Sequence, residues 1–174
     1  MLAVYRHMFT IPDLRRKILF TLLVFAVYRL GATIPVPGID LGQLNLLADQ
    51  TTGGVIGLLN LFSGGGLENF SVLGLGIMPY ITASIIMQLL QVVIPRLQAL
   101  QEEGNTGQKV ITQWTRYLTV ILALIQSTTL TFLAAQGSTI FGGISLIPDY
   151  NPWLAMLMVI TMTAGTAFVM WLGE

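Results

Sequence analysis

The sequence contains little charge, no cysteine and a single histidine. Only 9% of its 174 residues are charged, whereas 54% are hydrophobic. An ordinary soluble domain carries about 25% charged residues. So few charged side chains cannot cover a soluble core of this size, and lipid is the solvent that accepts such an apolar surface. We therefore expect an integral membrane protein.

The missing residue types also exclude several kinds of site. Without cysteine there is no disulfide, no thiolate metal site and no cysteine nucleophile. The one histidine, His7, lies before the first apolar segment, where we expect it to be solvated. No apolar segment holds two carboxylates, and the glycine runs lack the Lys-Ser/Thr pair of a phosphate-binding loop. We expect no enzyme, no cofactor and no metal, and the zero net charge argues against nucleic-acid binding.

Four apolar segments approach or reach the length of about 17–25 residues that a membrane-spanning helix needs. They run roughly over residues 18–34, 71–94, 117–135 and 153–172. Trp153 and Trp171 bound the last segment, as aromatic side chains at the two membrane interfaces do. The predicted fold class is all-α integral membrane, with about four transmembrane helices.

Glycine and proline interrupt two regions of the chain. Residues 53–64 hold about eight apolar residues between glycines, which is too short to span a bilayer. They predict a short re-entrant or interfacial helix, with an external apolar loop as the alternative. In the segment 71–94, Gly74, Gly76 and Pro79 predict a kinked or broken helix. The alternative is a proline tolerated within a well-packed membrane helix.

The basic residues indicate the orientation in the membrane. They precede the first segment (Arg6, Arg15, Arg16, Lys17) or lie in and beside the polar connection 95–116 (Arg96, Lys109, Arg116). The other two connections contain no Lys or Arg, so the N-terminus and the 95–116 loop are expected in the cytoplasm. Arg29, one turn before the end of the first segment, either snorkels to the outer headgroups or makes a buried pairing with a polar group or a partner subunit.

Neutral polar side chains remain as candidates for function. They are Asn60, Thr82, Ser84, Gln88, Gln91 and Gln126, and Ile77, Ile81, Ile85 and Ile86 lie between them at helical spacing. One interpretation is that these groups only join the helices through hydrogen bonds. The other is that they line a passage. Spacing alone favours the first.

Several long motifs resemble the SecY family, the channel subunit of the bacterial protein translocon. Residues 34–40 (IPVPGID) resemble the end of the family's first helix, residues 60–65 (NLFSGG) its plug region and residues 75–90 (LGIMPYITASIIMQLL) its second helix. Residues 103–104, 113–117 and 170–174 match in the same order and spacing. The resemblance covers essentially the whole chain.

The resemblance implies the N-terminal half of a ten-helix channel with two inverted halves. It implies a pore ring at Ile77 and Ile81 and a plug over roughly residues 53–64. The plug residues would be Val55, Ile56, Leu58, Leu59, Asn60, Leu61 and Phe62, and the lateral gate would be lined by Thr82, Ile85, Ile86 and Gln126. Such a channel secretes unfolded preproteins and releases membrane proteins sideways into the cytoplasmic membrane.

The resemblance also implies partners. These are the SecE and SecG subunits, the SecA motor ATPase or the ribosome, signal sequences and nascent chains, and membrane lipid, with no nucleic acid bound directly. The chain stops after its fourth apolar segment, within a family motif, so we expect a fragment of a longer gene product. Two alternatives are a fragment of a secondary transporter, which needs a mid-membrane ion or substrate site, and a structural membrane assembly protein.

Overall fold

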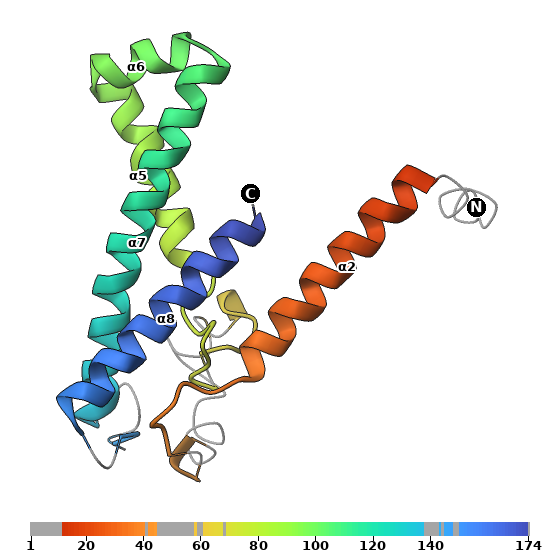
Figure 1. Cartoon of the computed structure of the whole chain (residues 1–174). Coiled ribbons are helices and arrows are strands. Elements are labelled where there is room, and N and C mark those ends of the chain that lie inside the picture. Colours follow the sequence, from red (N-terminus) through yellow and green to blue (C-terminus); the bar gives the residue numbers. More distant parts are fainter. Residues whose placement is uncertain are drawn as a thin grey trace.

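The structure is a computed structural model that describes residues 12–40, 42–44, 58, 61–67, 69–137, 143, 145–147 and 150–173. Its helices are α2 (Pro12–Thr33), α5 (Met78–Val93), α6 (Pro95–Glu102), α7 (Asn105–Ala135) and α8 (Pro152–Gly173). Within these ranges the only β-type pairing is an isolated bridge between Pro35 and Ser71. The all-α fold class is confirmed (Figure 1).

Two helices of the described part, α7 and α8, are long and apolar enough to cross a membrane. A third crossing is possible if α5 and α6, which meet at an angle of 99°, form one broken span. Every 18-residue stretch of α2 contains Arg16, Lys17 and Arg29, so α2 is too highly charged to qualify on composition. The membrane character is therefore supported, and the number of spans stays a prediction.

The predicted second segment, residues 71–94, is helical only from Met78 onwards. Residues 71–77 form a bridge residue and turns, and Gly76 adopts a left-handed conformation with φ of 57°. Pro79 lies in the first turn of α5, where a missing backbone N–H leaves no helical hydrogen bond unmade. The segment is thus interrupted in its first half, where Gly74 and Gly76 lie, and Pro79 is at the start of the helix rather than inside it.

The polar connection 95–116 is largely helical rather than a loop. Only Glu103 and Gly104 separate α6 from α7. At about 1.5 Å per residue, the 31 residues of α7 extend over about 46 Å, against about 30 Å for the hydrocarbon core. The polar first turns of α7 therefore continue beyond the membrane, and α6 folds back beside them.

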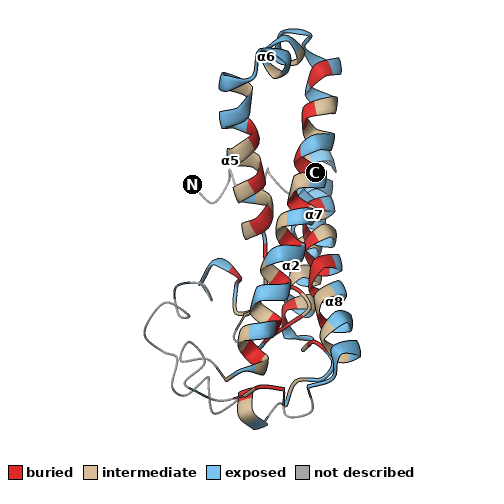
Figure 2. Cartoon of the chain, turned by 90° about the vertical axis from the view of Figure 1, so that its left-hand side faces the viewer, coloured by how far each residue is buried: buried red, intermediate tan, exposed pale blue. Residues whose placement is uncertain are grey.

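Helix α7 packs against both α5 and α8. Its buried positions recur along one side and are mostly small: Gly107, Ile111, Thr115, Thr119, Ala123, Ser127, Thr131 and Ala134. Small side chains let membrane helices approach closely. Ser127 Oγ and Thr163 Oγ1, 3.2 Å apart, join α7 to α8. Figure 2 shows the buried positions of α5 and α7 on the sides that face each other.

Helix α2 diverges from this bundle (Figure 1), and Ala32 is its only buried residue. Its C-terminal end is nevertheless attached to the segment before α5. The Val36 N–H donates to the Phe70 carbonyl and the Val72 N–H donates to the Ile34 carbonyl, both at 3.0 Å. These two bonds fix the chain after α2 to the chain that leads into α5.

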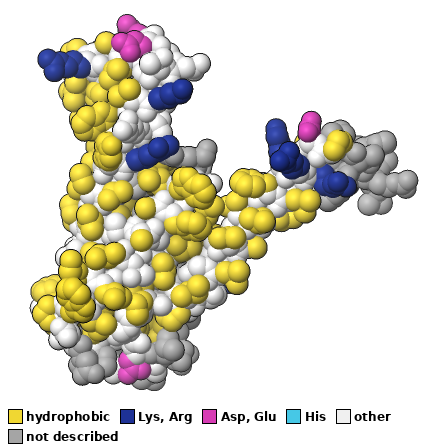
Figure 3. Space-filling model, in the orientation of Figure 1, with side chains coloured by type: hydrophobic (Ala, Val, Ile, Leu, Met, Phe, Trp, Pro, Cys, Tyr) yellow, Lys and Arg dark blue, Asp and Glu magenta, His cyan; other side chains and the backbone are white. Residues whose placement is uncertain are grey.

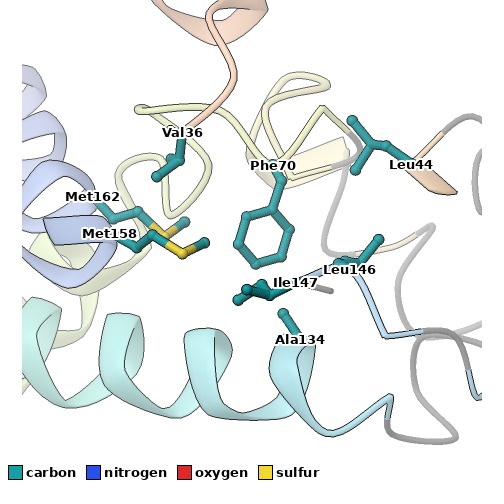
Figure 4. Close-up of a cluster of buried hydrophobic side chains, with 8 residues drawn as sticks. All are labelled: Val36, Leu44, Phe70, Ala134, Leu146, Ile147, Met158 and Met162. Atoms are coloured by element: carbon teal, nitrogen blue, oxygen red, sulfur yellow. The ribbon is translucent and has the colours of Figure 1, made fainter. Parts of the chain in front are cut away.

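A buried apolar cluster surrounds this junction (Figure 4). Its members are Val36, Leu44, Phe70, Ala134, Leu146, Ile147, Met158 and Met162. Phe70 is fully buried, and its ring projects toward the residues supplied by α7, α8 and the segment between them. The cluster therefore holds residues 70–72 against the α7–α8 pair and sets where α5 begins.

Candidate functional site

The two sides of α5 differ in what covers them. Pro79, Ala83 and Met87 are buried toward the bundle. Ile77, Ile81 and Ile85 recur every four residues on another side and remain 36%, 41% and 51% exposed. Helix α5 and its N-cap residue therefore present an apolar isoleucine face that the described part of the chain covers only in part.

Part of the predicted plug lies within the described residues. Leu58, Leu61 and Phe62 are helical, and their side chains are well exposed. Val55, Ile56, Leu59 and Asn60 lie outside the described residues. The described portion is thus apolar and exposed, as a segment that covers a pore requires, and its role as a plug stays a prediction.

A glycine-rich turn follows this short helix and is tied to α2. Gly64 and Gly65 both have positive φ, 60° and 87°, which glycine adopts without steric cost. The Tyr28 hydroxyl donates to the Ser63 carbonyl and Arg29 Nη1 donates to the Gly64 carbonyl, both at 2.9 Å. Asn69 Nδ2 donates to the next carbonyl, that of Gly65, at 3.2 Å.

Arg29 has a polar partner, as one of its two sequence-based alternatives required, but its side chain is exposed rather than buried, so the choice between the two stays open. Its partner is a backbone carbonyl of a distant segment, and a side-chain pattern gives no sign of such an acceptor. Tyr28 and Asn69 were missed for the same reason. The one available signal was an arginine in an apolar helix together with three consecutive glycines, residues 64–66, whose turn presents carbonyl groups.

A cleft of about 290 Å³ lies between the glycine-rich turn, the start of α5 and α7. Its walls are mostly apolar and consist of Ser63, Leu67, Gly74, Leu75, Met78, Ile125, Gln126, Thr129, Leu130 and Leu133. Gln126 is half-buried and is one of the few polar groups there. The structure therefore places Gln126 beside the turn and the first residue of α5.

The other predicted gate residues lie along α5. Ile85 is exposed, and Thr82 and Ile86 are half-buried. The Thr82 hydroxyl donates to the Met78 carbonyl of its own helix at 3.0 Å. In the part of the chain that the structure describes, no hydrogen bond joins Thr82 to Gln126. Their membership of one gate stays a prediction.

Charged groups gather at the ends of the molecule. Figure 3 shows Lys and Arg side chains at the tip formed by α6 and the start of α7 and at the start of α2. A cleft of about 360 Å³ beside α7 is lined by Lys109, Thr112, Gln113, Arg116 and Tyr117. Among the described residues, no group of three or more His, Cys, Asp or Glu is placed to hold a metal ion.

Comparison with known sequences decides the family. The sequence model of the SecY family matches residues 71–174, which is more than half of the chain. This chain belongs to the SecY family. The resemblance recognised in the sequence is confirmed, and a transporter fragment is left without support.

Curated relatives are similar in sequence to this chain over its full length. The protein translocase subunit SecY of Streptomyces coelicolor is 53% identical over 180 aligned residues, and that of Streptomyces griseus is 51% identical over 178. The protein of the same name from Mycobacterium tuberculosis is 45% identical over 179. Each alignment covers 100% of this chain and 41% of the relative. The chain therefore spans about two fifths of the length of these relatives.

Proposed function

We propose that this SecY-family chain forms part of a protein-conducting channel, the N-terminal part of its channel subunit. The channel secretes unfolded preproteins and releases hydrophobic segments sideways into the membrane. The observation that carries the proposal is the partly exposed isoleucine face of α5, opposite a side that packs against the bundle.

Ile77 and Ile81 form this chain's share of the pore ring. Isoleucine side chains bind no peptide group strongly, so an unfolded chain can slide past them. A narrow apolar ring also loses its water and so resists ions. The exposure of both residues, with Pro79 and Ala83 buried on the packed side, supports this assignment.

Residues 53–64 form the plug that closes the ring from the outer side. Leu58, Leu61 and Phe62 supply an apolar surface suited to cover isoleucine side chains. The glycine-rich turn after them lies beside the pore ring in the chain fold. A Cβ added to Gly76, the residue before Ile77, would lie 3.3 Å from the Ser63 Cα atom. This close approach of Ser63 to the residue before Ile77 supports a plug that lies next to the ring.

Thr82, Ile85, Ile86 and Gln126 line the lateral gate. The mostly apolar cleft that contains Gln126 lies between the start of α5 and α7 and supports a gate at this position. Neutral hydrogen bonds between membrane helices contribute about 1–2 kcal/mol each in model peptides. A gate held by a few such bonds opens when a hydrophobic signal sequence offers a larger apolar contact.

The channel works with partners. SecE and SecG complete it, the SecA motor ATPase or a translating ribosome supplies the energy, and signal sequences and nascent chains are its substrates. The exposed surface of α2 fits lipid or a partner subunit. The basic residues at the start of α2 and at the α6–α7 tip (Figure 3) support an orientation in which both lie on the cytoplasmic side of the cytoplasmic membrane. The chain itself performs no catalysis.

The pore-ring assignment is tested in a hybrid channel. These 174 residues replace the matching 41% of the Streptomyces coelicolor relative, and the hybrid is reconstituted with its partner subunits in a planar bilayer. We expect the Ile77→Gly/Ile81→Gly variant to raise ion conductance in the absence of substrate. Met156→Gly/Ile160→Gly is the matched control, because both residues are exposed on α8 at the same spacing. Conductance that stays at the parent level in the pore-ring variant contradicts the assignment.

A further inference from the structure

The last turns of α2 contact the plug through side chains that the channel proposal does not use. We propose that Tyr28 and Arg29 are positioning residues that form a latch, holding the hinge of the plug in its closed position. The latch rests on the proposed function of residues 53–64 as a plug. The observation that carries it is the pair of 2.9 Å hydrogen bonds from these side chains to the Ser63 and Gly64 carbonyls.

Both acceptor carbonyls follow directly after the short helix that includes Leu61 and Phe62. The Ser63 carbonyl also accepts from the Gly66 N–H at 3.1 Å, so the Tyr28 hydroxyl is a second donor to it. Carbonyl groups at the end of a helix carry a partial negative charge. A guanidinium group is a suitable donor to such a carbonyl, because charge-assisted hydrogen bonds are stronger than neutral ones. Arg29 thus binds the end of the plug helix from a neighbouring element.

The turn that the latch holds has the geometry of a hinge. Gly64 and Gly65 have positive φ and no side chain, so they change conformation at low steric cost. Downstream of them the chain is fixed, because Phe70 is fully buried and its carbonyl accepts from Val36 N–H at 3.0 Å. Movement of the plug is therefore concentrated in the turn, upstream of a rigid attachment.

Helix α2 and the chain after it contact this region both near residues 69–72 and at residues 63–64, and Asn69 Nδ2 donates to the Ala32 carbonyl at 3.5 Å. The chain after the end of α2 pairs with residues 70–72 through backbone hydrogen bonds. Tyr28 and Arg29 reach residues 63–64 through side chains alone. Loss of the side-chain contacts leaves the backbone pairing intact, so the hinge can be released without unfolding the junction.

Tyr28 also lies close to the start of α5. A Cβ added to Gly64 would lie 3.3 Å from Tyr28 Cε1, and one added to Gly76 would lie 3.6 Å from the Tyr28 hydroxyl oxygen. Gly76 directly precedes the pore-ring residue Ile77. The Tyr28 ring therefore occupies the meeting point of the hinge and the pore ring, where a closing contact is most effective.

Hydrogen–deuterium exchange in the hybrid channel measures the hinge directly. The variants are Tyr28→Phe, Arg29→Met, the double variant and Arg29→Lys, which keeps the charge. Thr33→Val is the matched control, because the Thr33 hydroxyl donates to the Leu30 carbonyl within α2. We expect exchange of residues 61–70 to be about ten-fold faster in the double variant, which corresponds to about 1.4 kcal/mol. Residues 112–130 of α7 should exchange at the parent rate, and Arg29→Lys should restore part of the protection.

Conductance without substrate distinguishes a latch from a local structural contact. We expect it to rise in the double variant and to stay at the parent level in Thr33→Val. Parent-level exchange at residues 61–70, or faster exchange with unchanged conductance, overturns the latch. If Ile77→Gly/Ile81→Gly raises conductance in the same preparation, the channel proposal stands and only the latch fails. If that variant has no effect either, the channel proposal fails with it.

Discussion

Gly165, in the middle of α8, offers a sharp test of how the helices are packed. A Cβ added there would overlap the Val72 carbonyl oxygen and lie 2.9 Å from the Val72 carbonyl carbon. It would also lie 3.1 Å from Leu73 Cδ2. The first two atoms belong to the backbone, which cannot rotate aside as a flexible side chain does. Gly165→Ala must therefore push α8 away from residues 72–73.

The expected change in the free energy of unfolding of Gly165→Ala is the sum of opposing contributions. Alanine is favoured over glycine in a helix interior by about 1 kcal/mol. Overpacking of a tight contact costs about 1–3 kcal/mol. The Val72 peptide is also held by its N–H donating to the Ile34 carbonyl, and loosening that bond costs about 1 kcal/mol more. The net expectation is a loss of about 2 kcal/mol in the free energy of unfolding.

Thermal unfolding of the purified chain in detergent provides the assay. For a protein of this size, 2 kcal/mol corresponds to a fall of about 4–8 °C in Tm. Gly173→Ala is the control, because among the described residues no atom outside its chain neighbours and its own helix backbone lies within 4 Å of the added Cβ. We expect its Tm to stay at or slightly above the parent value. A Gly165→Ala chain as stable as the parent refutes the close approach of α8 to Val72.

Two further predictions concern the core and the gate. Phe70→Ala removes the central ring of the buried cluster and should lower the free energy of unfolding by about 3–5 kcal/mol. Phe62→Ala, at an exposed position, should leave Tm near the parent value. If both variants lower Tm by the same amount, the result argues against the cluster. Gln126→Leu makes the cleft beside the start of α5 more apolar. In the hybrid channel we therefore expect a change in the hydrophobicity that a test segment needs for membrane insertion. An unaltered threshold would remove Gln126 from the gate.

Much of the fold was predictable because lipid restricts what a sequence can do. Apolar length and few charges predict helices, and these indicated the ends of α7 at Ala135 and of α8 close to Gly173. The start of α5 was not predictable in the same way. Residues 71–77 are as apolar as a helix, and what keeps them in turns is backbone pairing with residues 34–36 and burial of Phe70.

The candidate site, like the fold, was predictable only in part. The isoleucine face of α5 was predictable, because it depends on side chains at a helical period. The family motifs added a role for each position that spacing alone could not supply. The contacts of Tyr28 and Arg29 were not predictable, since their partners are carbonyl groups that every residue possesses. Only the fold determines which of those carbonyls are presented to α2.

The strength of the two latch contacts follows from their exposure and charge. Only Arg29 carries a charge, and its side chain is exposed. A hydrogen bond to a charged group contributes about 1.5–3 kcal/mol in general, and less where water competes for the same donor. The Arg29 bond to the Gly64 carbonyl therefore adds little net stability. A weak contact lets the hinge open for little free energy, which suits a latch better than a permanent structural bond.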